Sequence, residues 1–270
     1  MHVVHDLKDV DLSRPIAFVP TMGALHAGHS ALITQARKFS DSVIVSVFVN
    51  PHQFEYPNDF AKYPRSPEND FAMAQDAGAT VMWTPTEEML YPEGFEVLAS
   101  PTSGEKFEGV HRKGHFGGVL TAVNALFNAV KPTWAIFGEK DFQQLFLVRQ
   151  MVAERHMNIE IVATPTVRDP DGLALSSRNL RLSQSDREVS LVIGKALSKA
   201  ITMSSLSEAR FSLVKTLSQE PGFLLDYAAI IDEDTFELAS EQTPHKRALV
   251  AGWVNGVRLI DNMAMTSVGQ

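Results

Sequence analysis

The sequence of 270 residues predicts an α/β protein, built from a doubly wound parallel sheet and followed by a smaller α+β domain. Two observations carry this prediction. Short apolar runs rich in β-branched residues alternate with amphipathic segments as far as residue 163, a pattern typical of parallel strands joined by helices. Beyond the turn at residues 168–172 the alternation stops, and two helical segments precede three strand-like runs.

The first domain takes its predicted strands from apolar runs that end at turn-forming residues. We expect strands at residues 16–19, 42–50, 80–83, 134–137 and 159–163, and helices at residues 31–39, 66–78, 116–130 and 142–154. Residues 84–114 are rich in Pro, Gly and Glu and form a long excursion, a type of loop that often acts as a lid. Right-handed crossovers place helices on both faces of such a sheet, so the expected fold is Rossmann-like.

The second domain is expected to combine helices at residues 184–203 and 206–218 with strands at 225–231, 247–254 and 257–261. Asn255 and Gly256 form an Asn-Gly pair between the last two strands, a strong hairpin signal. We therefore divide the chain into residues 1–168 and residues 169–270.

Composition limits the function. Apolar residues make up 44% and charged residues 21% of the chain, as in ordinary globular proteins, and the formal net charge is −8. This charge argues against nucleic acid or an anionic membrane as a partner. No apolar run approaches a membrane span, and the first residues lack the features of a secretory signal, so we expect a cytoplasmic protein. The absence of cysteine excludes a disulfide scaffold, a thiol nucleophile and a Cys-ligated zinc site.

The most informative segment joins the first strand to the first helix. It contains two glycines and two histidines three positions apart, in the run Met22, Gly23, Ala24, Leu25, His26, Ala27, Gly28 and His29. A helix N-terminus presents unpaired N–H groups to an anion, and glycine lets a phosphate approach the backbone. Residues three apart share a helix face, so both imidazoles could meet one phosphate. The alternative is that the histidines only cap or pack the helix start.

Three more polar segments follow predicted strands or the domain boundary. They contain Asn50 and Gln53; Gly138, Glu139, Lys140, Asp141 and Gln144; and Leu175, Ser176, Ser177 and Arg178. Ligands bind outside the carboxyl ends of strands in open parallel sheets, so topology favours the convergence of these side chains.

These residue types suit a phosphorylated ligand. Lys140 offers an ammonium to a phosphate, although a surface lysine would look the same. Ser176, Ser177 and Arg178 offer hydroxyls and a forked guanidinium, or else form a loop with a helix cap. Asp141 suits either magnesium bound through water or an N-cap.

Gln53 and Gln144 are uncharged and can orient a hydroxylated or carboxylated substrate through amide hydrogen bonds. Glutamines without a functional role would show the same pattern.

Five blocks of the sequence together resemble the pantothenate synthetase family. They are Pro20-Thr-Met-Gly-Ala-Leu-His-Ala-Gly-His29, Phe48-Val-Asn-Pro-His-Gln-Phe54, Gly114-His-Phe-Gly-Gly-Val-Leu-Thr-Ala-Val-Asn124, Phe137-Gly-Glu-Lys-Asp-Phe-Gln-Gln144 and Asp171-Gly-Leu-Ala-Leu-Ser-Ser-Arg-Asn179. The histidine pair alone also resembles the nucleotide-binding motif of the wider adenylyl- and cytidylyltransferase superfamily.

The resemblance implies an ATP-dependent condensation of pantoate with β-alanine through pantoyl adenylate, with magnesium as cofactor and a homodimer as the assembly. Residues 1–168 would then bind nucleotide and pantoate. Because water would destroy the mixed anhydride, we expect residues 169–270 to act as a lid that moves Ser176 to Arg178 over the site and hinges near Val167.

The family resemblance also assigns roles to individual residues. The catalytic residues would be His26, His29 and Lys140, with His29 as proton donor, and the substrate would meet Asn50, Gln53 and Gln144. The ATP contacts would be residues 22–29, Gly138, Glu139, Lys140, Asp141, Val167, Leu175, Ser176, Ser177 and Arg178.

The sequence departs from the family pattern at two positions. His52 stands where an apolar residue is more usual, and its imidazole is expected to face outward; Leu175 stands where methionine is frequent. Two alternatives stay open: another ligase or nucleotidyltransferase of the superfamily, and an RNA-binding relative of the aminoacyl-tRNA synthetases. The acidic charge argues against the second.

Overall fold

The structure, a computed structural model, describes residues 1–55 and 57–265 and divides into two compact units. The first unit comprises Met1–Gly138 and Gln143–Pro165. The second contains Glu139–Phe142 and the chain from Thr166 onward. The first unit therefore ends at residue 165, and a short segment from the middle of the chain, Glu139–Phe142, belongs to the second unit.

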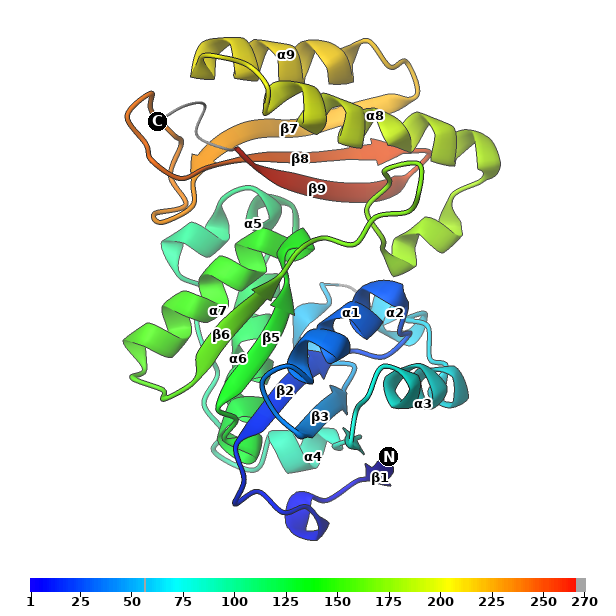
Figure 1. The fold of residues 1–270 in the computed structure, drawn as a ribbon, viewed down its shortest axis with the longest axis vertical. Coiled ribbons are helices and arrows are strands. Elements are labelled where there is room, and N and C mark those ends of the chain that lie inside the picture. Colours follow the sequence, from blue (N-terminus) through cyan, green and yellow to red (C-terminus); the bar gives the residue numbers. More distant parts are fainter. Residues whose placement is uncertain (56, 266–270) are drawn as a thin grey trace. The chain divides into compact units, whose positions relative to one another are not determined.

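The first unit is built on a six-stranded parallel sheet, in agreement with the predicted fold class. Its strand order is β1-β4-β3-β2-β5-β6 (Figure 1). The bounds are β1 His2–Val4, β2 Ile16–Thr21, β3 Ser42–Val47, β4 Val81–Trp83, β5 Trp134–Gly138 and β6 Glu160–Thr164. The short strand β1 escaped prediction because its few residues carry no periodic pattern, and pairing with β4 defines it.

Helices cover both faces of this sheet, as expected. Ala17 and Val19 of β2 pack on the side of Ile33 in α1. Phe18, on the opposite side of the same strand, meets Phe127 of α6 with ring centroids 6.3 Å apart. The helices of this half of the chain are α1 Ala27–Ala36, α2 Pro57–Ala61, α3 Pro67–Asp76, α4 Glu87–Leu90, α5 Glu108–His111, α6 His115–Val130 and α7 Phe142–Glu154.

The long excursion is less irregular than its composition suggested. It contains α4, α5 and the 3-10 turn η3 (Thr102–Glu105). Two further 3-10 turns are η1 (Leu7–Asp9) and η2 (Pro51–Gln53). Over the described residues, no helix combines the length and apolarity needed to cross a bilayer.

The second unit contains a three-stranded antiparallel sheet in the order β7-β8-β9, with α8 and α9 on one face (Figure 1). Leu197 and Leu213 of the two helices lie in one core with Val250 of β8. Asn255 and Gly256 both have positive φ, as the predicted hairpin requires. The bounds are η4 Glu139–Asp141, η5 Ser177–Arg181, α8 Gln184–Ala200, α9 Leu206–Ser218, β7 Phe223–Asp232, β8 Lys246–Val254 and β9 Val257–Met265.

Candidate active site

The loop after β2 has a backbone shape that a buried carboxylate holds. Gly23 and Ala24 both have positive φ, of 79° and 50°. Asp70 of α3, only 2% exposed, accepts hydrogen bonds from the backbone N–H groups of Ala24 at 2.9 Å and Leu25 at 2.7 Å. The Ser66 hydroxyl donates to the same carboxylate at 2.9 Å. Sequence reasoning missed Asp70, because nothing in a helix of ordinary composition reveals a partner 46 positions earlier.

The two histidines meet at the start of α1, which begins at Ala27, four positions before the predicted helix. His26 is the N-cap, and its Nδ1 accepts from the Gly28 N–H at 3.1 Å. The backbone N–H of His26 donates to Nδ1 of His29 at 3.2 Å. A neutral imidazole whose Nδ1 accepts carries its proton on Nε2. These bonds therefore assign an Nε2–H donor to each ring, and the ring centroids are 4.2 Å apart.

Asn50 and Gln53 are linked directly in the turn after β3. The Asn50 amide donates to Gln53 Oε1 and to the Gly118 carbonyl, each at 3.0 Å. Its oxygen accepts from the His52 N–H at 3.1 Å and the Tyr91 hydroxyl at 2.9 Å. Asn50 is 1% exposed and uses all four of its hydrogen-bonding positions within the protein.

Gln53 is fixed from further directions. Its Nε2 lies 2.8 Å from the sulfur of Met22, which brings two predicted site residues together. Its backbone carbonyl is 2.9 Å from Nδ1 of the buried His115. At Gly118 a Cβ atom would stand 2.1 Å from the His52 carbonyl oxygen, so only glycine lets η2 approach α6 this closely.

The two residues around Asn50 that carry ionisable rings behave differently. Burial raises the pKa of Tyr91, which keeps its hydroxyl protonated as the donor to Asn50. His52 is exposed, as expected, and its ring leans edge-on against Tyr91 at 4.9 Å between centroids.

The two adjacent glutamines of α7 lie in different environments. Gln143 is buried, donates to the carbonyls of Ser103 and Lys106 at 2.9 and 2.8 Å, and accepts from the Glu108 N–H at 3.1 Å. It therefore holds the excursion in place. Gln144 is half-buried, which leaves part of its surface accessible.

In the second unit, the backbone carbonyls of Glu139 and Lys140 both accept from the Asn262 amide at 2.9 Å. Lys140 is half-buried and Asp141 exposed. Sequence reasoning missed Asn262, since its partner segment lies more than 120 positions away.

Val167 and Leu175 pair across a hairpin, with the Leu175 N–H donating to the Val167 carbonyl at 2.9 Å. Ser176 caps η5 by accepting from the Arg178 N–H at 3.3 Å, so the capping interpretation of this serine is correct. Its hydroxyl proton can still be donated elsewhere. Ser177 and Arg178 are half-buried beside it.

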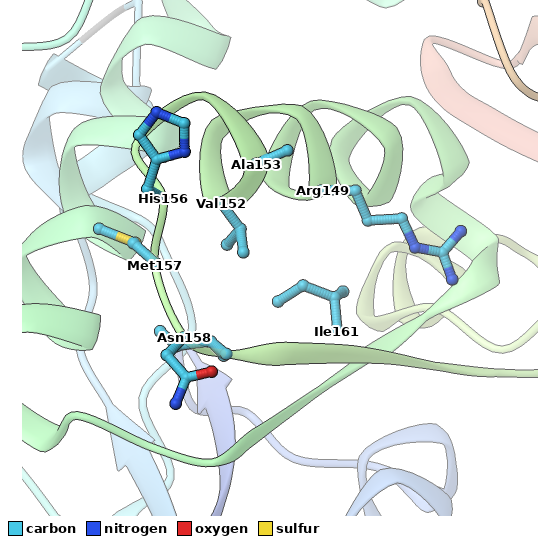
Figure 2. A pocket seen from close by; sticks show the side chains of 8 residues that line it. Arg149, Val152, Ala153, His156, Met157, Asn158 and Ile161 are labelled. Carbon is cyan, nitrogen blue, oxygen red and sulfur yellow. The ribbon is translucent and has the colours of Figure 1, made fainter.

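A separate cavity of about 470 Å³ lies between the end of α7 and β6, where Val152 and Ile161 point toward each other (Figure 2). None of the expected site residues lines this cavity. Within residues 1–55 and 57–265, no group of three or more His, Asp or Glu side chains is arranged to hold a metal ion.

A doubly wound parallel sheet whose β2 turns through glycine into a histidine-capped helix defines a nucleotide-binding protein of Rossmann-like class. Comparisons with known proteins narrow this class. The family model of pantoate-beta-alanine ligase matches residues 2–264.

A pantothenate synthetase of Thermobifida fusca is 42% identical, with 98% of this chain and 95% of the relative covered. One from Aeromonas hydrophila is 44% identical, with 93% and 90% covered. The crystal structure of pantothenate synthetase from Thermus thermophilus has a TM-score of 0.92 at 41% identity, over 97% of this chain and 99% of that one.

A fourth relative, the pantoate-beta-alanine ligase of Francisella tularensis complexed with beta-gamma ATP and β-alanine, has a TM-score of 0.79 at 35% identity, with 97% of each chain covered. The chain thus belongs to the pantoate–β-alanine ligase family. It is an enzyme that condenses pantoate with β-alanine at the expense of ATP.

Proposed function

We propose that the reaction runs through pantoyl adenylate, with His26 and His29 as donors to the phosphates of ATP. The pantoate carboxylate attacks the α-phosphorus, forming a C–O–P link while the bond to pyrophosphate breaks. The β-alanine amine then attacks the acyl carbon, and AMP leaves. The observation that carries the proposal is the pair of Nδ1 hydrogen bonds, which leaves both imidazoles with their proton on Nε2.

The first step depends more on stabilising the negative charge of the departing pyrophosphate than on a general base. Pantoate is ionised at neutral pH, so its attack depends on positioning. Negative charge grows on the pyrophosphate oxygens as the P–O bond breaks, and donors already aimed at that charge lower the barrier. We assign this role to the groups that can donate a proton or carry positive charge: His26, His29, Lys140, Ser176, Ser177 and Arg178.

ATP contacts are proposed for the residues that flank these donors. They are residues 22–29, Gly138, Glu139, Asp141, Val167 and Leu175. Gly23 and Gly28 would let the phosphates approach the backbone, and at Gly28 a Cβ atom would stand 2.8 Å from Cε1 of His26.

Pantoate is proposed to bind Gln53 and Gln144, and β-alanine to meet Gln53. Asn50 would act through Gln53, because its own amide is fully used within the protein while one of its N–H groups holds Gln53 Oε1. This bond directs the Gln53 amide so that its orientation is set before substrate arrives.

Magnesium is proposed to enter with ATP, bound mainly by phosphate oxygens and water, as is usual in nucleotide sites. Asp141, exposed at the end of η4, is the carboxylate best suited to a water-mediated contact. The metal would neutralise part of the negative charge of the departing pyrophosphate.

We also propose a homodimer in the cytoplasm, where the ATP supply lies. The family resemblance supports the dimer, and β6 is one of the two outer strands of the sheet, with half-buried Ile161, Val162 and Ala163. Analytical ultracentrifugation tests the dimer, and a monomer at micromolar concentration would contradict it.

Exchange of labelled pyrophosphate into ATP tests the proposed intermediate. The adenylate route predicts exchange with pantoate present and β-alanine absent. Exchange that ignores pantoate, or that occurs equally with unrelated acids, would refute the assignment. Salt-sensitive RNA binding without ATP turnover would favour the RNA-binding alternative.

A further inference from the structure

One side chain of the second unit holds the backbone that carries Lys140. Asn262, on β9, donates both hydrogens of its amide, one to the Glu139 carbonyl and one to the Lys140 carbonyl, each at 2.9 Å. It is 4% exposed. Two consecutive carbonyls that point to one donor fix the turn between them, and thus the direction in which the Lys140 side chain leaves the backbone.

Arg247 determines which way the Asn262 amide faces. Its Nη1 donates to Asn262 Oδ1 at 2.6 Å, so the NH₂ end must face the carbonyls. Arg247 is itself held tightly: Nε donates to Glu233 at 2.8 Å, and the guanidinium lies 4.0 Å from the centre of the Phe142 ring. Arg247 therefore also contacts Phe142, which follows Lys140 in the chain.

The strand that carries Asn262 is anchored by its neighbour. Asp261 makes a two-bond ion pair with Arg168, at 2.6 and 2.9 Å, and its side chain is 4% exposed. Arg168 also donates to the Gly172 carbonyl at 3.1 Å, inside the hairpin that precedes Ser176. Adjacent residues of β9 thus hold two separate segments that are assigned to ATP.

We propose that Asn262 is a positioning residue for Lys140: it holds the lysine backbone so that the side chain points at the phosphates of ATP. This inference rests on the proposed function, because it concerns the role of Lys140 in the first step. Its physical basis is that a donor must already be aimed at the developing charge, since a small misplacement is costly.

Two substitutions of Asn262 and one control separate positioning from stability. Asn262→Ala removes both N–H donors. Asn262→Asp keeps the size but places carboxylate oxygens opposite two carbonyls, so its defect should be at least as large. Ile230→Val, in the helix-packed core of the same sheet, controls for a mild loss of packing.

In pantoate-dependent pyrophosphate exchange, Asn262→Ala should lower kcat by about tenfold to a hundredfold with the KM for pantoate unchanged. The control variant should keep wild-type kcat at a temperature where all variants are folded. Hydrogen exchange followed by mass spectrometry should show faster exchange of the peptide spanning residues 138–142 in Asn262→Ala.

A double-mutant cycle gives the decisive readout. If Asn262 acts through Lys140, then Asn262→Ala should cause no further loss of kcat in a Lys140→Ala background. Fully additive losses, or wild-type kcat in Asn262→Ala, would overturn the inference alone. A wild-type enzyme without pantoate-dependent exchange would instead refute the proposed function, and this role of Asn262 with it.

Discussion

Asp70 holds Ala24 in a left-handed conformation through a hydrogen bond of 2.9 Å from the Ala24 N–H to its buried carboxylate. The next N–H, of Leu25, donates a second hydrogen bond, so the Asp70 carboxylate accepts from two consecutive backbone N–H groups. The helix that carries Asp70 thereby shapes the loop leading into His26. This relationship joins parts of the chain that no local pattern connects.

Replacing Asp70 by Asn should therefore damage both stability and catalysis. The amide has one oxygen where the carboxylate has two, so one backbone N–H loses its buried acceptor, at a cost of about 1–3 kcal/mol. Urea unfolding measures the loss, and kcat for pyrophosphate exchange should fall. Asp76→Asn, at the far end of α3, serves as a control and should leave both unchanged. Wild-type kinetics in Asp70→Asn would show that the loop shape does not matter to catalysis.

Gly118→Ala should displace the turn that carries Gln53. The new Cβ atom would stand 2.1 Å from the His52 carbonyl oxygen, so η2 must move away from α6. We expect a stability loss of about 1–3 kcal/mol from overpacking and a higher KM for pantoate. An unchanged KM in Gly118→Ala would separate this packing from pantoate binding.

His29→Ala should lower turnover more than substrate binding. The substitution removes an Nε2–H donor that we assign to the departing pyrophosphate, and the loss of one such donor costs about 100-fold to 1,000-fold in kcat. Lys140→Ala should show the same bias toward kcat. Steady-state kinetics at saturating ATP and pantoate measures both. A purely raised KM with normal kcat would contradict the assigned roles.

The adjacent glutamines of α7 provide a matched pair. Gln144→Ala should raise the KM for pantoate by about tenfold, the usual scale for one lost substrate hydrogen bond, with little change in melting temperature. Gln143→Ala removes three hydrogen bonds to the excursion and should lower the melting temperature. The reverse outcome, with Gln144→Ala unstable and kinetically normal, would exclude Gln144 from the pantoate site.

His245 should titrate above its ordinary range because of Asp234. The hydrogen bond between its Nδ1 and the Asp234 carboxylate, at 3.0 Å, raises the pKa of His245, and the charge of the same carboxylate adds to the effect. A histidine with a raised folded-state pKa stabilises the fold below its unfolded pKa, and this contribution disappears as pH rises through the folded value.

Nuclear magnetic resonance titration of the His245 ring tests this prediction, with Asp234→Asn expected to return the pKa toward the ordinary histidine value of about 6.5. Because both side chains are exposed, added salt should weaken the shift. A pKa that is insensitive to Asp234→Asn would show that the pair does not form in solution.

Much of the architecture was predictable because it depends on local periodicity. The apolar run at residues 16–19 and the Asn255-Gly256 turn each carry their own signal, and the structure confirms both. The start of α1 was placed four residues late, since a histidine N-cap is not among the usual capping residues. The strand β1 has too few residues to show a pattern, and only its pairing with β4 defines it.

The sequence by itself determined the longer strands and helices and their order along the chain, the family, and the chemical types of side chain available for ATP and pantoate. Motif residues can be identified in this way because their spacing is short. Only the tertiary structure decided what holds them: Asp70 on the loop before His26, Asn50 on Gln53, and Asn262 on the backbone of Lys140. The last of these pairs a segment from the middle of the chain with a strand near its end, so the contact exists only once the second unit has folded.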